Sequence, residues 1–192
     1  MKLAFDVDGV VLRSIEVILD HVNSITGRNI APTDLLTWDL DPLKLSSSVL
    51  REAVDYLYSM KSIDPYEGAV ETLEKIYEVS QRPLLFITGR ADPNTAKRQL
   101  ETLPWNRSVP EMIVIGGSRD KRAFLKDSKA NFIIEDDEMH LGDYLSAGVG
   151  VGLMLQPWNR NCKLPVNARF DGWSEIEVWF TNNLEQGFEP IR

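Results

Sequence analysis

The chain has little of what several classes of protein depend on. Its 192 residues include one cysteine, Cys162, and two histidines, His21 and His140. An internal disulfide framework and a multi-thiolate zinc site are therefore excluded. The two histidines are too scattered for a histidine-rich metal centre, and each is interpreted as an ordinary packed or solvated side chain. No apolar run approaches the roughly 20 residues that a membrane-spanning helix needs, so we expect no membrane partner.

Positive charge is also scarce. The chain has 21 lysines and arginines against 29 aspartates and glutamates, a net charge of −8. This balance argues against binding a nucleic-acid polymer through surface charge. A small anionic substrate stays compatible with it, because a metal and a few placed cations can offset local carboxylates. The apolar stretch at residues 3–5 is too short for a signal peptide, and we expect a cytoplasmic protein.

The pattern of apolar residues predicts an α/β protein. The composition, 43% hydrophobic and 26% charged, allows one large domain, or one domain with an insertion. Short apolar runs typical of buried strands occur at 3–7, 83–88, 112–115, 132–134 and 149–155. Helical patterns separate the last four runs, at about 92–103, 120–127 and 137–147. Strands that alternate with helices favour a parallel sheet covered on both faces.

Residues 8–82, seventy-five in all, separate the first two strands, more than a single crossover helix requires. One amphipathic pattern ends at Gly27, and a second follows the serines at 46–48. Residues 64–67, Asp-Pro-Tyr-Glu, combine an N-cap, a first-turn proline and an acid, which predicts the start of a crossover helix over 67–79. We therefore predict a helical insertion over 14–64 and a core formed by 1–13 and 65–192.

The first strand ends in Asp6-Val7-Asp8-Gly9. Residues i and i+2 of an extended segment share a face, so both carboxylates should project to the same side. Ligands bind at the carboxyl ends of parallel strands, and glycine permits a close backbone turn there. Two buried carboxylates need a cation. The alternative is a solvated turn that carries two acids.

Four consecutive acids, 135–138, follow the fourth strand. Such a run repels itself unless a cation sits there, and its oxygen ligands suit Mg²⁺ better than a soft transition metal. We assign Asp136 and Glu135 to the metal. Asp137 and Glu138 are interpreted as compensating the dipole of the following helix.

The end of the second strand and the start of a later helix carry groups suited to phosphate. Thr88 and Gly89 offer a hydroxyl and free backbone amides to a phosphoryl oxygen. Lys121, at the start of a helix, can neutralise a phosphoryl group and a carboxylate together. Arg90 is predicted to contact phosphate or substrate, with a surface ion pair as the alternative.

Taken in order, these motifs resemble the four-motif set of the haloacid dehalogenase superfamily: Asp6-x-Asp8-Gly9, Thr88-Gly89, Lys121 and Glu135-Asp136. The resemblance implies a Rossmann-like core with a five-stranded parallel sheet, in the order 5-4-1-2-3, and a helical cap inserted after the first motif. It also implies that Asp6 attacks phosphorus, that Asp8 is the acid and base, and that Mg²⁺ lies on Asp6, Asp8 (through its backbone carbonyl) and Asp136, with Glu135 nearby.

A narrower resemblance concerns the substrate. Residues 33–40, Thr-Asp-Leu-Leu-Thr-Trp-Asp-Leu, and 156–160, Gln-Pro-Trp-Asn-Arg, are similar to segments of the 5′(3′)-deoxyribonucleotidase family. Residues 11–14 depart from that family's pattern. The resemblance implies that Trp38 stacks on a nucleobase, with a place in the cap's core as the alternative. Trp158 is interpreted as shaping the loop after the fifth strand.

The predicted activity is magnesium-dependent hydrolysis of phosphomonoesters through an aspartyl phosphate on Asp6. Nucleoside monophosphates are the first substrate class, and another small phosphoester, such as a sugar phosphate, is the alternative. The third alternative is a non-catalytic magnesium-binding or phosphorylated regulatory module. A receiver domain also uses Asp, Thr and Lys at strand ends, but it lacks a catalytic acid two residues after the nucleophile. A homodimer is left open.

Overall fold

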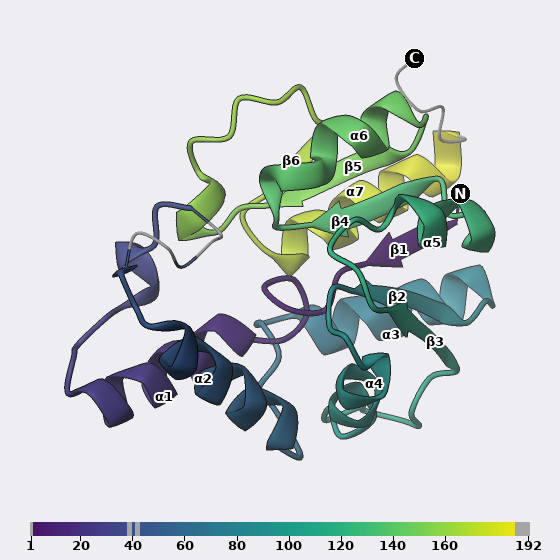
Figure 1. The fold of residues 1–192 in the computed structure, drawn as a ribbon. Helices are drawn as coiled ribbons and strands as arrows, with labels where there is room; N and C mark the ends of the chain where they lie inside the picture. Colours follow the sequence, from purple (N-terminus) through teal and green to yellow (C-terminus); the bar gives the residue numbers. More distant parts are fainter. Residues whose placement is uncertain (1, 38–39, 41–42, 187–192) are drawn as a thin grey trace.

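The centre of the computed structural model, which describes residues 2–37, 40 and 43–186, is a parallel sheet in the order β3-β2-β1-β4-β5-β6 (Figure 1). Its strands are β1 Leu3–Phe5, β2 Leu84–Thr88, β3 Met112–Gly116, β4 Phe132–Glu135, β5 Gly150–Met154 and β6 Ala168–Phe170. The first five strands lie in the predicted order, 5-4-1-2-3.

The sixth strand was not predicted. β6 has three residues and extends the sheet beside β5, with Gly152 opposite Ala168 and Met154 opposite Phe170. Only Phe170 of the three is buried, so no apolar run marks the strand in the sequence. It is an edge strand that pairs on one side, and the sheet around it specifies its position more than its own residues do.

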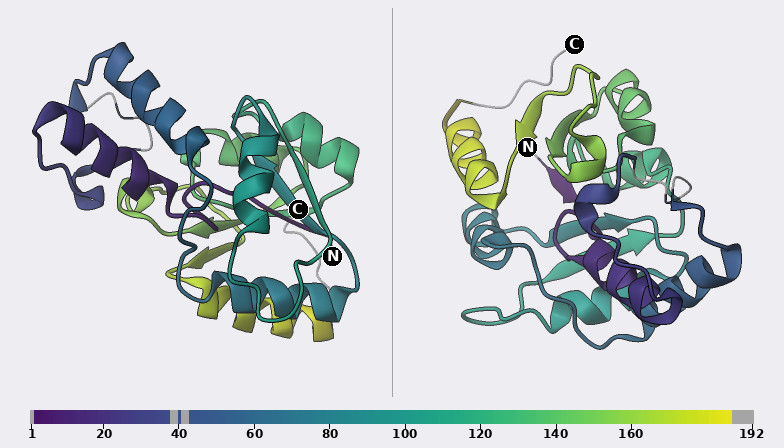
Figure 2. Two further views of the ribbon diagram at one scale, coloured as in Figure 1. Left: turned by 90° about the horizontal axis from the view of Figure 1, so that it is seen from below. Right: turned by 90° about the vertical axis from the view of Figure 1, so that its left-hand side faces the viewer.

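Helices cover both faces of the sheet. Alternate residues of β2 belong to two hydrophobic clusters, Phe86 to one and Leu85 and Ile87 to the other. The first cluster includes side chains of α3 Ala69–Ser80, α4 Pro93–Glu101 and α7 Trp173–Gln186, and α3 packs against α7 (Figure 2). The second includes side chains of α5 Arg122–Ser128 and α6 Leu141–Ser146. Among these described helices, none has the length and apolar character that crossing a membrane requires.

The remaining long helices, α1 Ser14–Thr26 and α2 Ser47–Ser59, pack against each other beside the sheet (Figure 1). Arg13 N donates to Asp64 O at 3.0 Å, and Tyr66 N donates to Val11 O at 2.9 Å. The segment predicted as a cap therefore leaves and rejoins the rest of the chain at one place. Gly27 ends α1 in the left-handed conformation, as predicted. The division into a core and a cap stays a prediction.

The crossover helix predicted over 67–79 is confirmed as α3, but the start signal predicted at 64–67 is wrong. α3 begins at Ala69, with Gly68 as its N-cap. Pro65 instead forms an antiparallel bridge with Leu12. Residues 64–67 thus form a turn at the base of the insertion and no helix. Their backbone hydrogen bonds to residues 11–13 determine this conformation more than the local helix signal does. The helix predicted over 137–147 is also divided, into a 3-10 turn Glu138–His140 and α6.

Candidate active site

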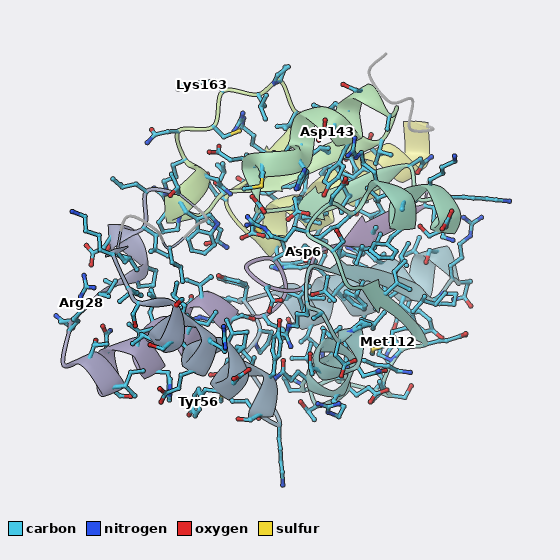
Figure 3. All side chains as sticks on the ribbon, in the orientation of Figure 1. Asp6, Arg28, Tyr56, Met112, Asp143 and Lys163 are labelled. Atoms are coloured by element: carbon cyan, nitrogen blue, oxygen red, sulfur yellow. The ribbon has the colours of Figure 1, made fainter. Side chains whose placement is uncertain are left out.

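The candidate site lies at the carboxyl edge of the sheet, next to α1 and α2 (Figure 3). Asp6 directly follows β1, Thr88 ends β2 and Glu135 ends β4, while Lys121 directly precedes α5. All four side chains are buried. This edge is where parallel α/β sheets bind ligands, so the topology brings polar residues from four distant parts of the chain to the expected place.

Three carboxylates meet at this edge. Asp6, Glu135 and Asp136 each offer an oxygen within 4.8 Å of the others, and all three residues are buried. Burial and then repulsion from Glu135 raise the pKa of Asp6 and of Asp136 well above the ordinary carboxyl value. Buried carboxylates are costly unless positive charge compensates them. The cluster therefore requires cations.

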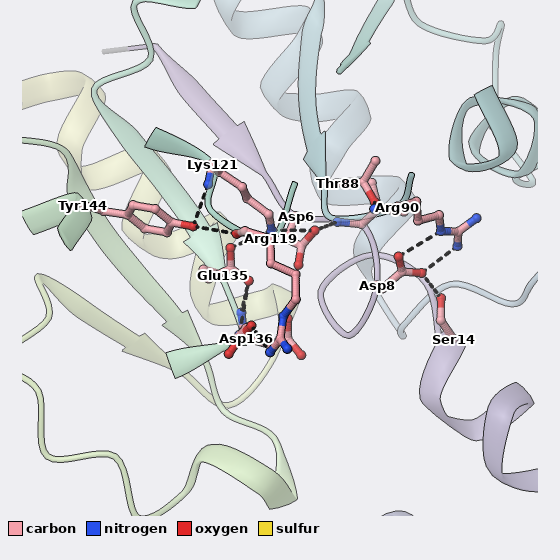
Figure 4. Close-up of polar contacts among 12 residues, drawn as sticks. Asp6, Asp8, Ser14, Thr88, Arg90, Arg119, Lys121, Glu135, Asp136 and Tyr144 are labelled. Carbon is pink, nitrogen blue, oxygen red and sulfur yellow. Dashed lines mark hydrogen bonds and ion pairs between the residues drawn. The ribbon is translucent and has the colours of Figure 1, made fainter. Parts of the chain in front are cut away.

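Lys121 supplies one of these positive charges (Figure 4). Its Nζ lies 2.8 Å from Asp6 Oδ1 and 2.7 Å from Glu135 Oε2. Burial alone would lower the pKa of this ammonium group, but Asp6 and Glu135 raise it above its ordinary value, so Lys121 is charged. The backbone N–H of Lys121 donates to the hydroxyl of Tyr144 at 3.2 Å. One lysine cannot neutralise three ionised carboxylates, and a divalent cation would supply the remainder.

The donor set fits magnesium, which prefers hard oxygen ligands. Asp136 lies directly against the turn of the first motif: a Cβ built on Gly9 would be 2.1 Å from Asp136 Oδ2. Gly9 also has a φ of 79°, in the left-handed region. Only glycine permits this turn and leaves room for the Asp136 carboxylate. Within the acidic cluster, Asp6 and Asp136 are the side chains best placed to hold the metal.

Glu135 and Asp8, the other two predicted metal ligands, have different surroundings from Asp6 and Asp136. Glu135 Oε2 accepts from Lys121, and its Oε1 accepts from the backbone N–H groups of Asp136 and Asp137, each at 3.1 Å. Glu135 therefore orients Lys121 as well as contributing charge. The carboxylate of Asp8 is not part of the described acidic cluster.

Two residues that were not predicted to belong to the site donate hydrogen bonds to Asp136. Trp158 Nε1 donates to Asp136 Oδ2 at 3.0 Å, and Asn159 Nδ2 donates to Asp136 O at 2.8 Å. Both lie in the 3-10 turn Pro157–Asn159 after β5 and are buried. Trp158 is thus more than the loop-shaping residue predicted from the sequence. A polar-tipped tryptophan next to an asparagine, at the end of a strand beside β4, was the available signal.

Asp8 belongs to a second polar group (Figure 4). Arg90 Nε donates to its Oδ2 at 2.9 Å and Arg90 Nη2 donates to its Oδ1 at 2.6 Å, while the Ser14 hydroxyl also donates to Oδ1. Burial alone would raise the pKa of Asp8, but Arg90 and then Ser14 lower it below its ordinary value. Arg90 is 3% exposed, so the alternative of a surface ion pair is wrong. Ser14, at the start of α1, was not identified from the sequence.

Two of the three predicted phosphate-binding residues line a cavity of about 180 Å³. Gly89 and Lys121 line it together with Asp6 and Asp8. Thr88 precedes Gly89 in the chain and is fully buried, and it is not among the described residues that line the cavity. Its hydroxyl oxygen accepts from the backbone N–H of Arg90 at 3.2 Å.

The side of the cavity formed by α1 and α2 is largely apolar. Its lining residues there are Ser14, Ile15, Ile18, Val54, Leu57 and Tyr58. Arg90, Arg119 and Asp137 complete the lining, and Arg119 and Asp137 form an ion pair of 2.8 Å. Asp137 also accepts from the N–H of Met139 at 3.0 Å, consistent with the predicted role at a helix start. Trp38, the predicted base-stacking residue, lies outside the described residues.

No family model matches the sequence, and no curated protein matches it either. Solved structures do match. A haloacid dehalogenase-like hydrolase from Streptococcus pneumoniae has a TM-score of 0.63 at 16% identity, over 93% of this chain and 97% of the other. CbbY from Rhodobacter sphaeroides, in complex with phosphate, has a TM-score of 0.60 at 12% identity, over 92% and 96%. An L-2-haloacid dehalogenase has a TM-score of 0.58 at 8% identity, over 93% and 98%.

At such identities the likeness establishes the fold and not the activity. The chain has the fold of haloacid dehalogenase-type hydrolases, which confirms the superfamily resemblance at that level. The matched proteins differ in chemistry, since one is described as a dehalogenase and another was solved with phosphate. The resemblance to deoxyribonucleotidases stays a prediction.

Proposed function

We propose that the chain is a magnesium-dependent phosphomonoester hydrolase that attacks through Asp6 and forms an aspartyl phosphate. The observation that carries this proposal is the position of Asp6, which lines the cavity, belongs to the acidic cluster and lies 2.8 Å from Lys121 Nζ. A carboxylate in that position has cationic help on one side and room for a substrate on the other. The shared fold with hydrolases supports the same reading.

The proposed reaction has two displacements at phosphorus. In the first, an Asp6 oxygen bonds to phosphorus while the bond to the leaving oxygen breaks, and in the second, water attacks phosphorus and releases Asp6. A covalent intermediate divides one difficult step into two. Magnesium, when bound by Asp6 and Asp136, would offset the charge of the carboxylates and of the phosphoryl group. Lys121 and Gly89, which line the cavity, would hold the remaining phosphoryl oxygens, and Thr88 would join them if its buried hydroxyl turned from the N–H of Arg90 toward the cavity.

Asp8 is the proposed acid and base. It would donate a proton to the leaving oxygen and then accept one from the attacking water. In the structure its carboxylate is engaged by Arg90 and Ser14. An ionised carboxylate in a charged pair has no proton to donate, so the pair with Arg90 must open and Asp8 must take up a proton from solvent before it acts as the acid.

Nucleoside monophosphates remain the first proposed substrate class, on the strength of the narrower resemblance and Trp38. The cavity favours a second candidate, a smaller phosphoester. Its volume of about 180 Å³ is below the roughly 300–1,000 Å³ that drug-sized ligands occupy. The side formed by α1 and α2 is mostly aliphatic, with Ile15, Ile18 and Val54, so it offers few hydrogen-bond partners to the hydroxyls of a sugar. A small apolar leaving group would fit this side better than a sugar does.

A phosphate-release screen tests the proposal. The purified chain is assayed with nucleoside monophosphates, sugar phosphates and a small aryl phosphate, each with magnesium or with excess chelator. Halide release from 2-haloacids is measured in parallel. We expect phosphate release that chelator abolishes and no halide release. Full turnover in chelator, or release of halide alone, would refute the assignment.

A further inference from the structure

Gln99 is a completely buried amide that bonds to two parts of the molecule at once. It lies on α4, outside the described lining of the cavity. Its Oε1 accepts from Arg90 Nη1 at 2.7 Å. Its Nε2 donates to Leu57 O and Met60 O, each at 2.9 Å. Those two carbonyls lie at the end of α2, one of the two helices that cover the cavity. One side chain thus joins that helix to Arg90.

Arg90 also binds Asp8, through the two guanidinium nitrogens that do not contact Gln99. Its Nε and Nη2 donate to the two oxygens of Asp8 at 2.9 and 2.6 Å. Its Nη1 donates to Gln99 and, at 3.5 Å, to the hydroxyl of Thr95. The ring of Tyr58, from α2, lies 5.4 Å from the guanidinium carbon. A guanidinium group is a rigid planar fork, so the bond from Gln99 to one nitrogen sets the direction in which the other two point.

The chemistry of the amide determines which way Gln99 faces. With its oxygen and nitrogen exchanged, the oxygen would face two carbonyl oxygens and the nitrogen would face a guanidinium donor, which gives three repulsive contacts. In the observed orientation the amide accepts once and donates twice, and all three bonds are satisfied. A residue without both a donor and an acceptor cannot join these two partners.

We propose that Gln99 is a positioning residue for the reaction. Its oxygen orients Arg90, and through Arg90 the carboxylate of Asp8, while its nitrogen seats the end of α2 over the cavity. This inference rests on the proposed function and concerns the step in which ionised Asp8, held by Arg90, accepts a proton from the attacking water. It also gives Arg90 a defined role, that of the group that holds Asp8.

Two substitutions separate the two halves of the amide. Gln99→Glu keeps an acceptor for Arg90 but loses the donors to α2, whereas Gln99→Met, of similar length, loses both. Thr102→Val is the matched control, because the Thr102 hydroxyl lies 2.7 Å from the backbone carbonyl of Gln99 and 3.3 Å from Lys61 O, at the same junction of α4 with the segment after α2, but it has no bond to Arg90. Each protein is assayed for kcat and KM with 4-nitrophenyl phosphate and magnesium, and for amide hydrogen exchange at residues 57–61.

We expect Gln99→Met to lower kcat about tenfold to a hundredfold, the range that misplacement by about 1 Å can reach, with a far smaller change in KM. Gln99→Glu should lose less kcat than Gln99→Met, because it keeps the acceptor for Arg90, although its second oxygen faces the carbonyls of Leu57 and Met60. Both should exchange faster than wild type at 57–61. Thr102→Val should leave kcat unchanged. If Gln99→Met does not fold, Gln99→Asn takes its place with the same expected loss, because its amide is one methylene too short to span both partners.

The inference fails if Gln99→Met keeps the wild-type kcat, or if Gln99→Glu or Thr102→Val loses as much as Gln99→Met. Unchanged exchange at 57–61 in both Gln99 variants would overturn the tie to α2, and that readout needs no activity. A wild-type chain that releases no phosphate from any ester would instead refute the proposed function.

Discussion

Replacing Lys121 with methionine should destabilise the folded protein in a manner that magnesium reverses. The lysine side chain is 4% exposed and lies between Asp6 and Glu135. Methionine fills a similar space and carries no charge. The variant would leave three buried carboxylates, those two and Asp136, without their nearest cation.

The size of the effect follows from this burial. Removal of one partner from a buried ion pair costs about 3–5 kcal/mol. That is a large part of the roughly 5–15 kcal/mol by which a typical domain is stable. The pKa of Asp6 is raised in the folded state, chiefly by burial, so the folded form binds protons at a pH where the unfolded form has released them. Stability therefore falls as pH rises above the unfolded carboxyl value of about 3.9, and without Lys121 it falls further.

Urea unfolding measures this difference. At pH 7 in chelator, Lys121→Met should be less stable than wild type by about 3–5 kcal/mol. The difference in the free energy of unfolding between Lys121→Met and wild type should become smaller at pH 5 and on addition of magnesium. Lys126→Met, on the exposed face of α5, is the control and should stay within about 0.5 kcal/mol of wild type. If Lys121→Met is as stable as this control in chelator at pH 7, the buried acidic cluster is not charged as described and the reasoning is wrong.

Three further predictions concern the site. Trp158→Phe keeps an aromatic ring but removes the donor to Asp136, so the magnesium concentration for half-maximal activity should rise about tenfold or more, as titration would show. Asp8→Asn should lower kcat about 10²–10⁴-fold and leave magnesium binding intact, as steady-state kinetics and calorimetry would show; a small loss would remove Asp8 from proton transfer. Trp38→Ala should erase any preference for nucleotides over sugar phosphates without changing aryl phosphate hydrolysis, and a variant that unfolds would place Trp38 in the core.

Much of the core could be predicted from the sequence, because its signals are local. Each buried strand is a short apolar run, the acids and the threonine stand at the ends of these runs, and the lysine directly precedes a helix. Parallel topology then brings strand ends together without further information. β6 could not be predicted in this way, since two of its three residues are not buried and β5 supplies the pairing. The turn at 64–67 was misread for the same reason, because its partner lies more than fifty residues earlier.

The polar partners at the site were harder to predict. Arg90 and Lys121 look like surface cations in the sequence, and their burial becomes evident only when Asp8, Asp6 and Glu135 are placed around them. Gln99 carries no signal in the sequence, since a glutamine within an amphipathic helix is ordinary. Its significance depends on two carbonyls about forty residues earlier in the chain.

The most direct test of the central claim is detection of the phosphoryl group on Asp6. Wild-type protein is mixed with substrate and magnesium, quenched rapidly in acid and digested, and its peptides are weighed. We predict one added phosphoryl group on the peptide that contains Asp6, and none in Asp6→Asn, which should also release no phosphate. If the wild type releases phosphate while its Asp6 peptide stays unmodified, and Asp6→Asn keeps substantial activity, covalent catalysis by Asp6 is contradicted and a metal-activated water must attack instead.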